Sequence, residues 1–266
     1  MKLKPVESDK DIKIDDGDAR VRHRKRLPHS VKAAAEKEGD RIAKLQRLLY
    51  ADRRYALLIV LQGRDASGKD GTIRKVFASV NPQGCEVTSF GVPTELERRH
   101  DFLWRIHARV PARGMIGIFN RSHYEDILVP RVHDEIDKKG LRDRYRQIND
   151  FERHLVENNT VLLKFMLHVS RDEQRTRLEE RLLDETKNWK FRVGDLDDRQ
   201  HWTEFSEAYR GILEHTSTKH APWYIVPADD NDVRDWLVAR TIADTLDDLD
   251  LRYPTIDPAV KGITIK

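Results

Sequence analysis

The sequence has almost no cysteine and no long apolar run. Its single cysteine, Cys85, cannot form an internal disulfide, and we interpret it as a small core residue in a strand. This usage is typical of a reducing compartment, so we expect a cytoplasmic protein. No apolar stretch approaches the roughly 20 residues that span a bilayer. The opening MKLKPVESDKDIKIDD is too charged for a secretory signal, and we expect no membrane partner.

The sequence also has only a small excess of basic over acidic residues. Lys and Arg number 49 and Asp and Glu number 46, which leaves a formal net charge of +3. Basic residues nevertheless concentrate at positions 20–26 and 171–192, and such patches suit polyanions, nucleic acid included. Solvated helix faces explain single runs equally well. A nucleic-acid-binding module is a weaker alternative, because no aromatic-rich platform for single strands is visible.

Strands and helices are predicted to alternate along the 266 residues. Apolar runs predict strands at 55–62, 85–90, 115–119, 160–169 and 222–226. Helical spacing and capping boxes predict helices at 30–50, 71–78, 94–108, 141–157, 170–183, 202–214 and 233–249, with 189–198 irregular. Such alternation favours an α/β fold with a parallel sheet of about five strands flanked by helices. We expect residues 1–30 to be a mobile arm and 31–266 a single P-loop domain.

The segment GRDASGKDGT follows a predicted strand and opens a predicted helix, which is the setting of a phosphate-binding loop. Backbone N–H groups of such a loop, together with the helix N-terminus, bind anions. Lys69 is placed to neutralise phosphoryl oxygens during transfer, and Lys75 could extend the basic track. The other predicted phosphate-binding residues of the loop are Gly63, Ala66, Ser67, Gly68 and Asp70.

Asp70 stands where a nucleotide triphosphatase carries a Ser or Thr hydroxyl for Mg²⁺. Asp65, inside the loop, supplies a carboxylate instead. Because Mg²⁺ keeps several waters and needs only one or two carboxylates, we predict that Asp65 helps to hold the metal. The alternative is that Asp65 only caps a turn.

A second candidate site follows the strand in MIGIFNRSHYED, where α/β sheets bind ligands. Asn120 occupies the place of the acid at the tip of a Walker B strand. Arg121 could clamp phosphoryl oxygens, and Asp126 could bind Mg²⁺ or orient the attacking phosphate. The alternative is a helix start whose acids, Glu125 and Asp126, complement the helix dipole.

The stretch 171–195 combines a leucine face with many cations. In P-loop kinases a basic lid at this place closes over the phosphates, and we predict a helical lid at about 171–200. A solvated helix, with Glu179 and Glu180 balancing the charge, is the alternative. The cations proposed to contact phosphate are Arg177, Arg181, Lys187 and Lys190.

Four segments in this order give the chain a resemblance to the polyphosphate kinase 2 family: GRDASGKDGT, SFGVPTELERRHDFLWRIH, FNRSHYED and WKFRVGDLDDR. The resemblance extends from about residue 30 to about residue 249. It implies phosphoryl transfer between inorganic polyphosphate and adenine or other nucleotides with Mg²⁺, for which Mn²⁺ is a possible substitute. It also implies a P-loop fold with a helical lid and a homo-oligomer. Asp65 and Lys69 match the family's loop, which does not require Ser or Thr after the lysine.

Within the family, FNRSHYED resembles the subgroup that accepts nucleoside monophosphates as well as diphosphates, since other members carry Asp at the place of Asn120. The resemblance implies that Asp126 is an essential acid near metal and nucleotide. It matches Arg121, Arg131 and the lid cations to phosphate-contacting positions. An ATP-dependent P-loop nucleotide or metabolite kinase remains the alternative enzyme. The residues implied on the nucleotide side are Gly91, Val92, Pro93, Thr94, Asn120, Arg121, Glu125 and Asp126.

Overall fold

The structure is a computed structural model that describes residues 1–7, 12, 14–21, 24–192 and 194–265. Five strands form one sheet in the order β2-β3-β1-β4-β5, and every neighbouring pair is parallel. The predicted α/β class and the strand positions are therefore confirmed. The strands are β1 (Ala56–Gln62), β2 (Cys85–Ser89), β3 (Ile116–Asn120), β4 (Thr160–His168) and β5 (Trp223–Pro227).

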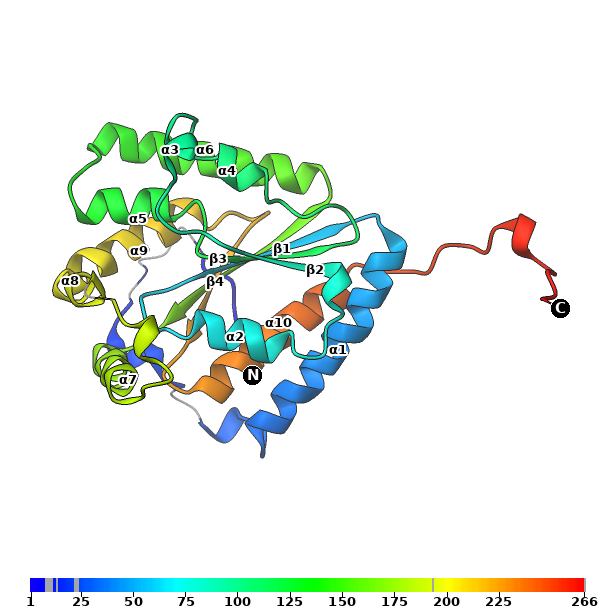
Figure 1. The fold of residues 1–266 in the computed structure, drawn as a ribbon, viewed down its shortest axis with the longest axis horizontal. Coiled ribbons are helices and arrows are strands. Elements are labelled where there is room, and N and C mark those ends of the chain that lie inside the picture. Colours follow the sequence, from blue (N-terminus) through cyan, green and yellow to red (C-terminus); the bar gives the residue numbers. More distant parts are fainter. Residues whose placement is uncertain (8–11, 13, 22–23, 193, 266) are drawn as a thin grey trace.

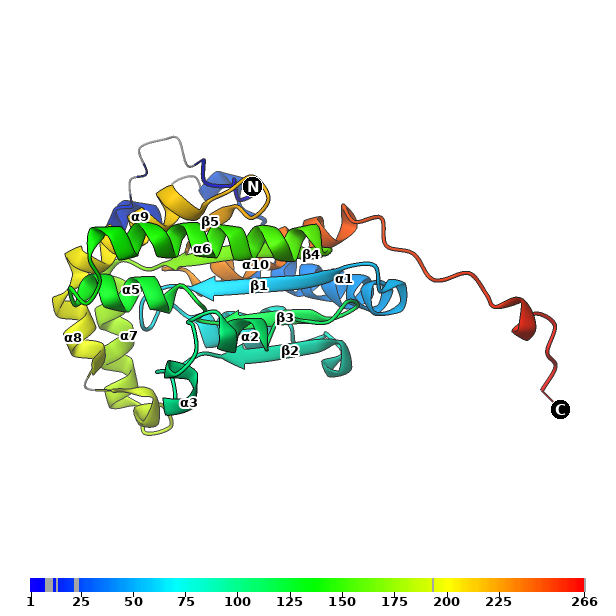
Figure 2. The same ribbon diagram turned by 90° about the horizontal axis from the view of Figure 1, so that it is seen from above.

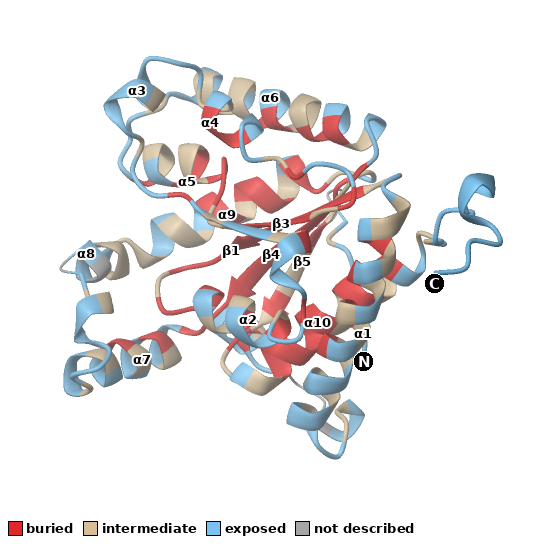
Figure 3. Ribbon diagram, turned by 45° about the vertical axis from the view of Figure 1, so that its right-hand side comes forward, coloured by how far each residue is buried: buried red, intermediate tan, exposed pale blue. Residues whose placement is uncertain are grey.

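Helices cover both faces of the sheet (Figures 1 and 2). One face carries α1 (Val31–Asp52), α2 (Lys69–Val76) and α10 (Asn231–Asp247). The other carries α5 (Glu125–Val132), α6 (Lys138–Glu157) and α9 (Trp202–Thr216). Two buried clusters, one on each face, make the core, and Figure 3 shows the burial running along the strands and α10. No helix in the described part of the chain is both long and apolar enough to cross a membrane.

Two predictions of local structure are wrong, one of a helix and one of an irregular segment. The single helix expected at 94–108 is two short ones, α3 (Glu95–Arg98) and α4 (Trp104–His107). The predicted capping box at Thr94 is present, but the Asp101 carboxylate accepts a hydrogen bond from the Leu103 N–H and starts a new turn. The region 189–198 is also more regular than expected. After α7 (Arg171–Leu183) come a short 3-10 turn, η4 (Asn188–Lys190), and the helix α8 (Gly194–Gln200).

Both chain ends differ from the predicted domain limits. The expected mobile arm packs on the domain in its described part: Ile12, Ile14 and Ala19 are buried. The Val6 N–H donates to the carbonyl of Trp223 in β5, and the Asp229 N–H donates to the carbonyl of Ala19. Conversely, residues 251–265, predicted as part of the domain, extend away from it (Figure 1). The buried apolar residues of the N-terminal segment are isolated and show no regular period. Hydrophobic periodicity therefore could not predict that this segment packs on the domain.

Gly117 allows the segment before β3 to cross the strand closely. A Cβ atom at Gly117 would lie 2.8 Å from the ring carbons of Pro111. Because a proline ring cannot move aside as a flexible side chain can, Gly117→Ala should lower the free energy of unfolding by about 1–3 kcal/mol, measured by chemical denaturation. Gly194→Ala is the control, since its Cβ would meet no atom within 4 Å. Equal stability of the two variants would contradict this account of the crossing.

Candidate active site

The predicted phosphate-binding loop joins β1 to α2 and depends on backbone that only small residues adopt easily. Gly63 and Gly68 have φ of +153° and +98°, and Ala66 has φ of +62°. A Cβ at Gly68 would lie 2.0 Å from a guanidinium nitrogen of Arg234 in α10, and the φ of +98° would strain any other residue. The buried hydroxyl of Ser67 has no hydrogen-bond partner among the described residues. The loop therefore has the shape and an uncommitted polar group expected of an anion site.

Lys69, the first residue of α2, folds back over this loop. Its Nζ donates to the carbonyls of Gly63 at 2.6 Å and Arg64 at 3.2 Å. Burial and the neighbouring charge of Arg121 lower the pKa of Lys69 to about 8. The ammonium is therefore partly desolvated and gains from any anion that enters the loop.

Arg121 joins the loop to the turn after β3. Its guanidinium lies 2.6 Å from Asp65 Oδ1 and 3.5 Å from Glu125 Oε2. Its own φ is +64°, a conformation that a non-glycine residue adopts only when its surroundings hold it there. Burial raises the pKa of Glu125, whereas Lys69 and Arg121 outweigh burial at Asp65 and lower the pKa of that carboxyl. Two cations, Lys69 and Arg121, and two acids, Asp65 and Glu125, thus gather at one edge of the sheet.

A pocket opens beside this charge cluster, between the loop, α5 and the helices that follow β4. Arg64, buried and absent from the predicted set, closes one wall: its guanidinium stacks on Trp202 at 3.9 Å and donates to Ser206 Oγ at 2.6 Å. Its position inside the loop motif was the only signal in the sequence. The lining residues are Gly63, Arg64, Asp65, Arg121, Glu125, Leu128, Val129, Gln174, Asp198, Phe205 and Tyr209.

Asp70, the residue in place of the usual hydroxyl, bridges three elements. Its carboxylate accepts from the Asn120 amide at 2.8 Å and lies 3.4 Å from Lys190 Nζ in η4. Burial acts against ionisation, but these two contacts outweigh it and lower the pKa of Asp70. The exchange of hydroxyl for carboxylate therefore links α2 to the tip of β3 and to the predicted lid.

Asp126 lies in a different environment from Asp65. Arg105 of α4, which the sequence analysis did not identify, donates to Asp126 Oδ2 at 3.3 Å and to the carbonyl of Gly91 at 2.9 Å. It thereby ties Asp126 to the predicted nucleotide segment, in which Val92 is 87% exposed. Burial raises the pKa of Asp126, and Arg105 opposes this shift. No spacing rule connects positions 91, 105 and 126, so only the fold reveals this contact.

Different arginines hold the two acids predicted to serve Mg²⁺: Arg121 pairs with Asp65, and Arg105 pairs with Asp126. In the described part of the chain, no three His, Cys, Asp or Glu side chains group as metal ligands. The donor set still suits Mg²⁺, because a single carboxylate beside a phosphate site, with waters and phosphate oxygens, can complete its coordination. Asp65, in the loop and on the pocket wall, fits this role directly.

The predicted phosphate-binding cations divide into three groups. Arg177 has a structural contact: it donates to the carbonyls of Ala66 at 3.0 Å and Ala228 at 2.7 Å, and so fixes the loop against the end of β5. Arg181 lies close enough to Asp65 to lower the pKa of that carboxyl.

The third set of cations, Lys75, Arg131 and Lys187, has its observed partners outside the loop. Lys187 pairs with Asp184 at 2.8 Å, and Lys75 pairs with Asp232 at 3.2 Å. The guanidinium of Arg131 lies 3.3 Å from the Tyr145 hydroxyl and does not line the pocket. The structure therefore does not bring these three to the loop, and their predicted role stays a prediction.

Comparison with known proteins finds relatives of the chain in sequence and in structure. A family model described as Polyphosphate kinase 2 (PPK2) matches residues 27–254. The chain is 52% identical over 226 residues to an AMP/ADP-polyphosphate phosphotransferase from Meiothermus ruber, with 85% of each covered. It is 45% identical over 232 residues to an ADP-polyphosphate phosphotransferase from Rhodopseudomonas palustris, with 83% of this chain and 80% of the relative covered.

A solved structure agrees as well. The crystal structure of polyphosphate kinase 2 from Arthrobacter aurescens superposes with a TM-score of 0.84 at 43% identity, covering 85% of this chain and 82% of the other. The resemblance seen in the four sequence segments is thereby confirmed. With a family match over most of its length and close relatives in sequence and fold, the chain belongs to the polyphosphate kinase 2 family.

Proposed function

We propose that the protein transfers phosphoryl groups from inorganic polyphosphate to AMP and ADP, reversibly and with Mg²⁺. The observation that carries the proposal is the cluster of Lys69, Arg121, Asp65 and Glu125 around the loop, in a chain 52% identical to an AMP/ADP-polyphosphate phosphotransferase. Its two cations face a loop built for phosphate, and its acids keep the cluster near neutrality until a polyanion enters.

In the proposed reaction, the loop holds the terminal phosphoryl groups of polyphosphate. A terminal phosphate oxygen of the nucleotide attacks the last phosphorus in line, and the bond from that phosphorus to the bridging oxygen breaks. The electron pair stays on the shortened chain, whose new terminal oxygen gains negative charge. Lys69 and Arg121 stabilise this charge as it shifts. Little base catalysis is needed, because a nucleotide phosphate is already largely ionised.

The acids have separate tasks in this proposal. When bound, Mg²⁺ neutralises charge on the transferring phosphoryl group, and Mn²⁺ is a possible substitute. Asp65 contributes a ligand from the loop. Asp126, held by Arg105 beside Gly91, acts from the nucleotide side, where its charge attracts the metal–nucleotide complex. Asn120, neutral and bound to Asp70, suits the nucleoside monophosphate acceptors of the proposed subgroup.

The setting of the reaction is also proposed. The one cysteine, Cys85, is free and partly buried in β2, and burial raises the pKa of its thiol to about 11, which makes it unreactive. Such a protein suits the cytoplasm, where both substrates would be available. We expect a homo-oligomer there.

The first prediction concerns the donor. Purified protein with AMP, long-chain polyphosphate and Mg²⁺ should form ADP and then ATP, measured by separating the nucleotides. A matched reaction with ATP and AMP but no polyphosphate tests the alternative of an ATP-dependent kinase. Absence of conversion with every nucleotide acceptor would refute the proposed function. Conversion of ADP without AMP would refute only the subgroup.

The second prediction concerns Lys69. Lys69→Met keeps much of the side chain's volume but removes its charge, so turnover should fall by roughly 10² or more while the protein stays folded. Lys44→Met, at an exposed position of α1, is the matched control and should keep the rate of the unaltered protein. Turnover of Lys69→Met near that of the control would remove this lysine from the mechanism.

The third prediction concerns the acids and Mg²⁺. Asp65→Asn and Asp126→Asn keep size but remove the charge that attracts a cation, so each should need much more Mg²⁺ for half-maximal rate, or lose activity at any concentration. Rates are measured against Mg²⁺ concentration. Asp248→Asn, at an exposed position after α10, serves as the control. If both active-site variants keep the rate and the Mg²⁺ curve of the unaltered protein, these acids are structural.

A further inference from the structure

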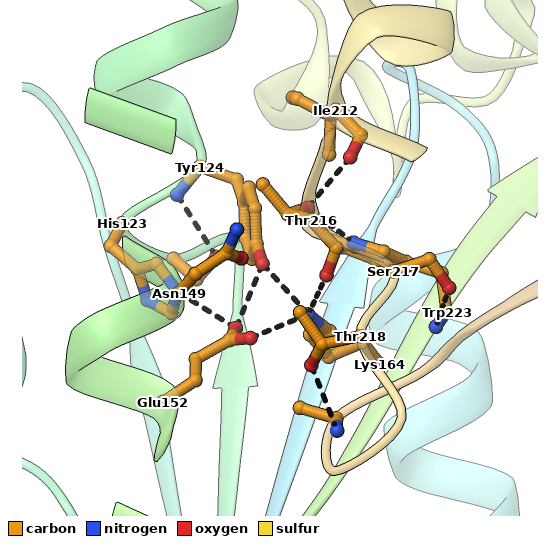
Figure 4. Close-up of polar contacts among 12 residues, drawn as sticks. His123, Tyr124, Asn149, Glu152, Lys164, Ile212, Thr216, Ser217, Thr218 and Trp223 are labelled. Carbon is orange, nitrogen blue, oxygen red and sulfur yellow. Dashed lines mark hydrogen bonds and ion pairs between the residues drawn. The ribbon is translucent and has the colours of Figure 1, made fainter. Parts of the chain in front are cut away.

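A fully buried ion pair contacts Tyr124, in the turn before α5 (Figure 4). Lys164 Nζ of β4 is 2.6 Å from Glu152 Oε2 of α6, and both side chains have 0% exposure. Lys164 lies opposite Val60 of β1, in the centre of the sheet. Two charges so far from water are costly unless every donor and acceptor finds a partner.

The partners of this pair come from the NRSHYED turn and from the end of α9. The ammonium of Lys164 also donates to the Tyr124 hydroxyl at 2.9 Å and to the carbonyl of Thr216 at 2.8 Å, which uses its third proton. Glu152 Oε1 accepts from the Tyr124 hydroxyl at 2.8 Å and lies 3.3 Å from His123 Nε2. Burial opposes the ionisation of Glu152, but Lys164 and His123 outweigh it and lower the pKa of that carboxyl.

We call His123, Tyr124, Glu152 and Lys164 the buried tetrad. Its two turn residues stand between Arg121 and Glu125 in sequence, and both are fully buried. Arg121 and Glu125, in contrast, line the pocket. The turn is thus held from its buried side by hydrogen bonds to a fixed ion pair, and its other side presents the charges of the active site. Tyr124 also packs edge-on against Trp223, with ring centroids 4.8 Å apart.

Stability alone does not account for charges at this place. Well-packed apolar side chains of similar volume often stabilise a core as much as a buried ion pair, or more. Apolar packing is not directional, whereas hydrogen bonds are. The hydrogen bonds of Tyr124 and His123 therefore fix the orientation of the turn relative to the sheet. Arg121 needs such a constraint, because its φ of +64° is unfavourable and its guanidinium must reach Asp65.

We infer that the buried tetrad is a positioning device, which sets Arg121 and Glu125 around the loop for phosphoryl transfer. The inference rests on the proposed function for what is positioned, and on the contacts of the tetrad for how it is positioned. All four members are fully buried and none lines the pocket, so they act only through the two residues that they hold.

The experiment replaces both charges at once. The double variant Lys164→Met/Glu152→Met avoids an unpaired buried charge and nearly conserves volume, so it should fold. Its kcat should fall by about 10- to 100-fold, the scale of a small misplacement of catalytic groups, while KM for ADP changes little. Tyr124→Phe is the milder variant: it leaves the ion pair in place but removes the hydrogen bonds of the hydroxyl to Glu152 and from Lys164, and should lower kcat by about two- to tenfold.

A double-mutant cycle distinguishes positioning from general loosening. Arg121→Met is made in the unaltered protein and in the double variant. If the tetrad acts through Arg121, removing Arg121 costs much less in the double variant, and the losses do not multiply. Leu246→Ala, in the buried core of α10, is the control: it should lower the melting temperature yet keep kcat. Full multiplication of the losses, or an unchanged kcat in both folded tetrad variants, overturns the inference.

Failure of the positioning role can be distinguished from failure of the proposed function. The unaltered protein is assayed first, and if it transfers no phosphoryl group, the proposed function fails on its own. The same cycle is then read from the binding of inorganic tripolyphosphate by calorimetry, which needs no turnover. Non-additive losses of affinity support the positioning role, and additive losses or unchanged affinity overturn it.

Discussion

The contact between Arg121 and Asp65 joins the two turns on which the rest of the site depends. One turn follows β1 and the other follows β3, and the strands pair in parallel so that both turns end at the same edge of the sheet. Because the guanidinium also reaches Glu125, a single side chain sets the distance between the loop and the start of α5. Lys69 and the pocket wall lie beside this bridge.

Local signals were sufficient to predict the positions of the strands and of the loop. β1 and β4 are short apolar runs followed by polar residues, and glycine at positions 63 and 68 marks backbone that other residues resist. The same approach failed where the chain depends on distant partners. Arg105 reaches Asp126 and Gly91 from a short helix, and no periodicity predicts such a contact. The buried charge of Lys164 was equally hidden, because a lysine in an apolar strand is normally read as exposed.

The two ends of the predicted lid are held with different strength. Arg177 in α7 holds the loop through backbone carbonyls, so it cannot leave with a moving element without disturbing the loop. Lys190 in η4 makes one exposed contact with Asp70, and Trp189 beside it is 76% exposed. The base of this region is therefore part of the scaffold, while its tip is held by a contact weak enough to exchange. Sequence alone could not divide the cations in this way, because all of them are basic residues on one stretch of chain.

The lowered pKa of Lys69 links ligand binding to protons. Because burial lowers the pKa of Lys69 to about 8, some of the free protein molecules carry a neutral Lys69 at mildly alkaline pH. A polyanion that enters the loop favours the ammonium, so these molecules take up a proton as they bind. Heat measured on binding would then vary with the ionisation enthalpy of the buffer, and affinity would increase as the pH falls from 9 toward 7. Because the burial of Lys69 over the loop lowers its pKa, the binding of a polyanion is coupled to the uptake of a proton.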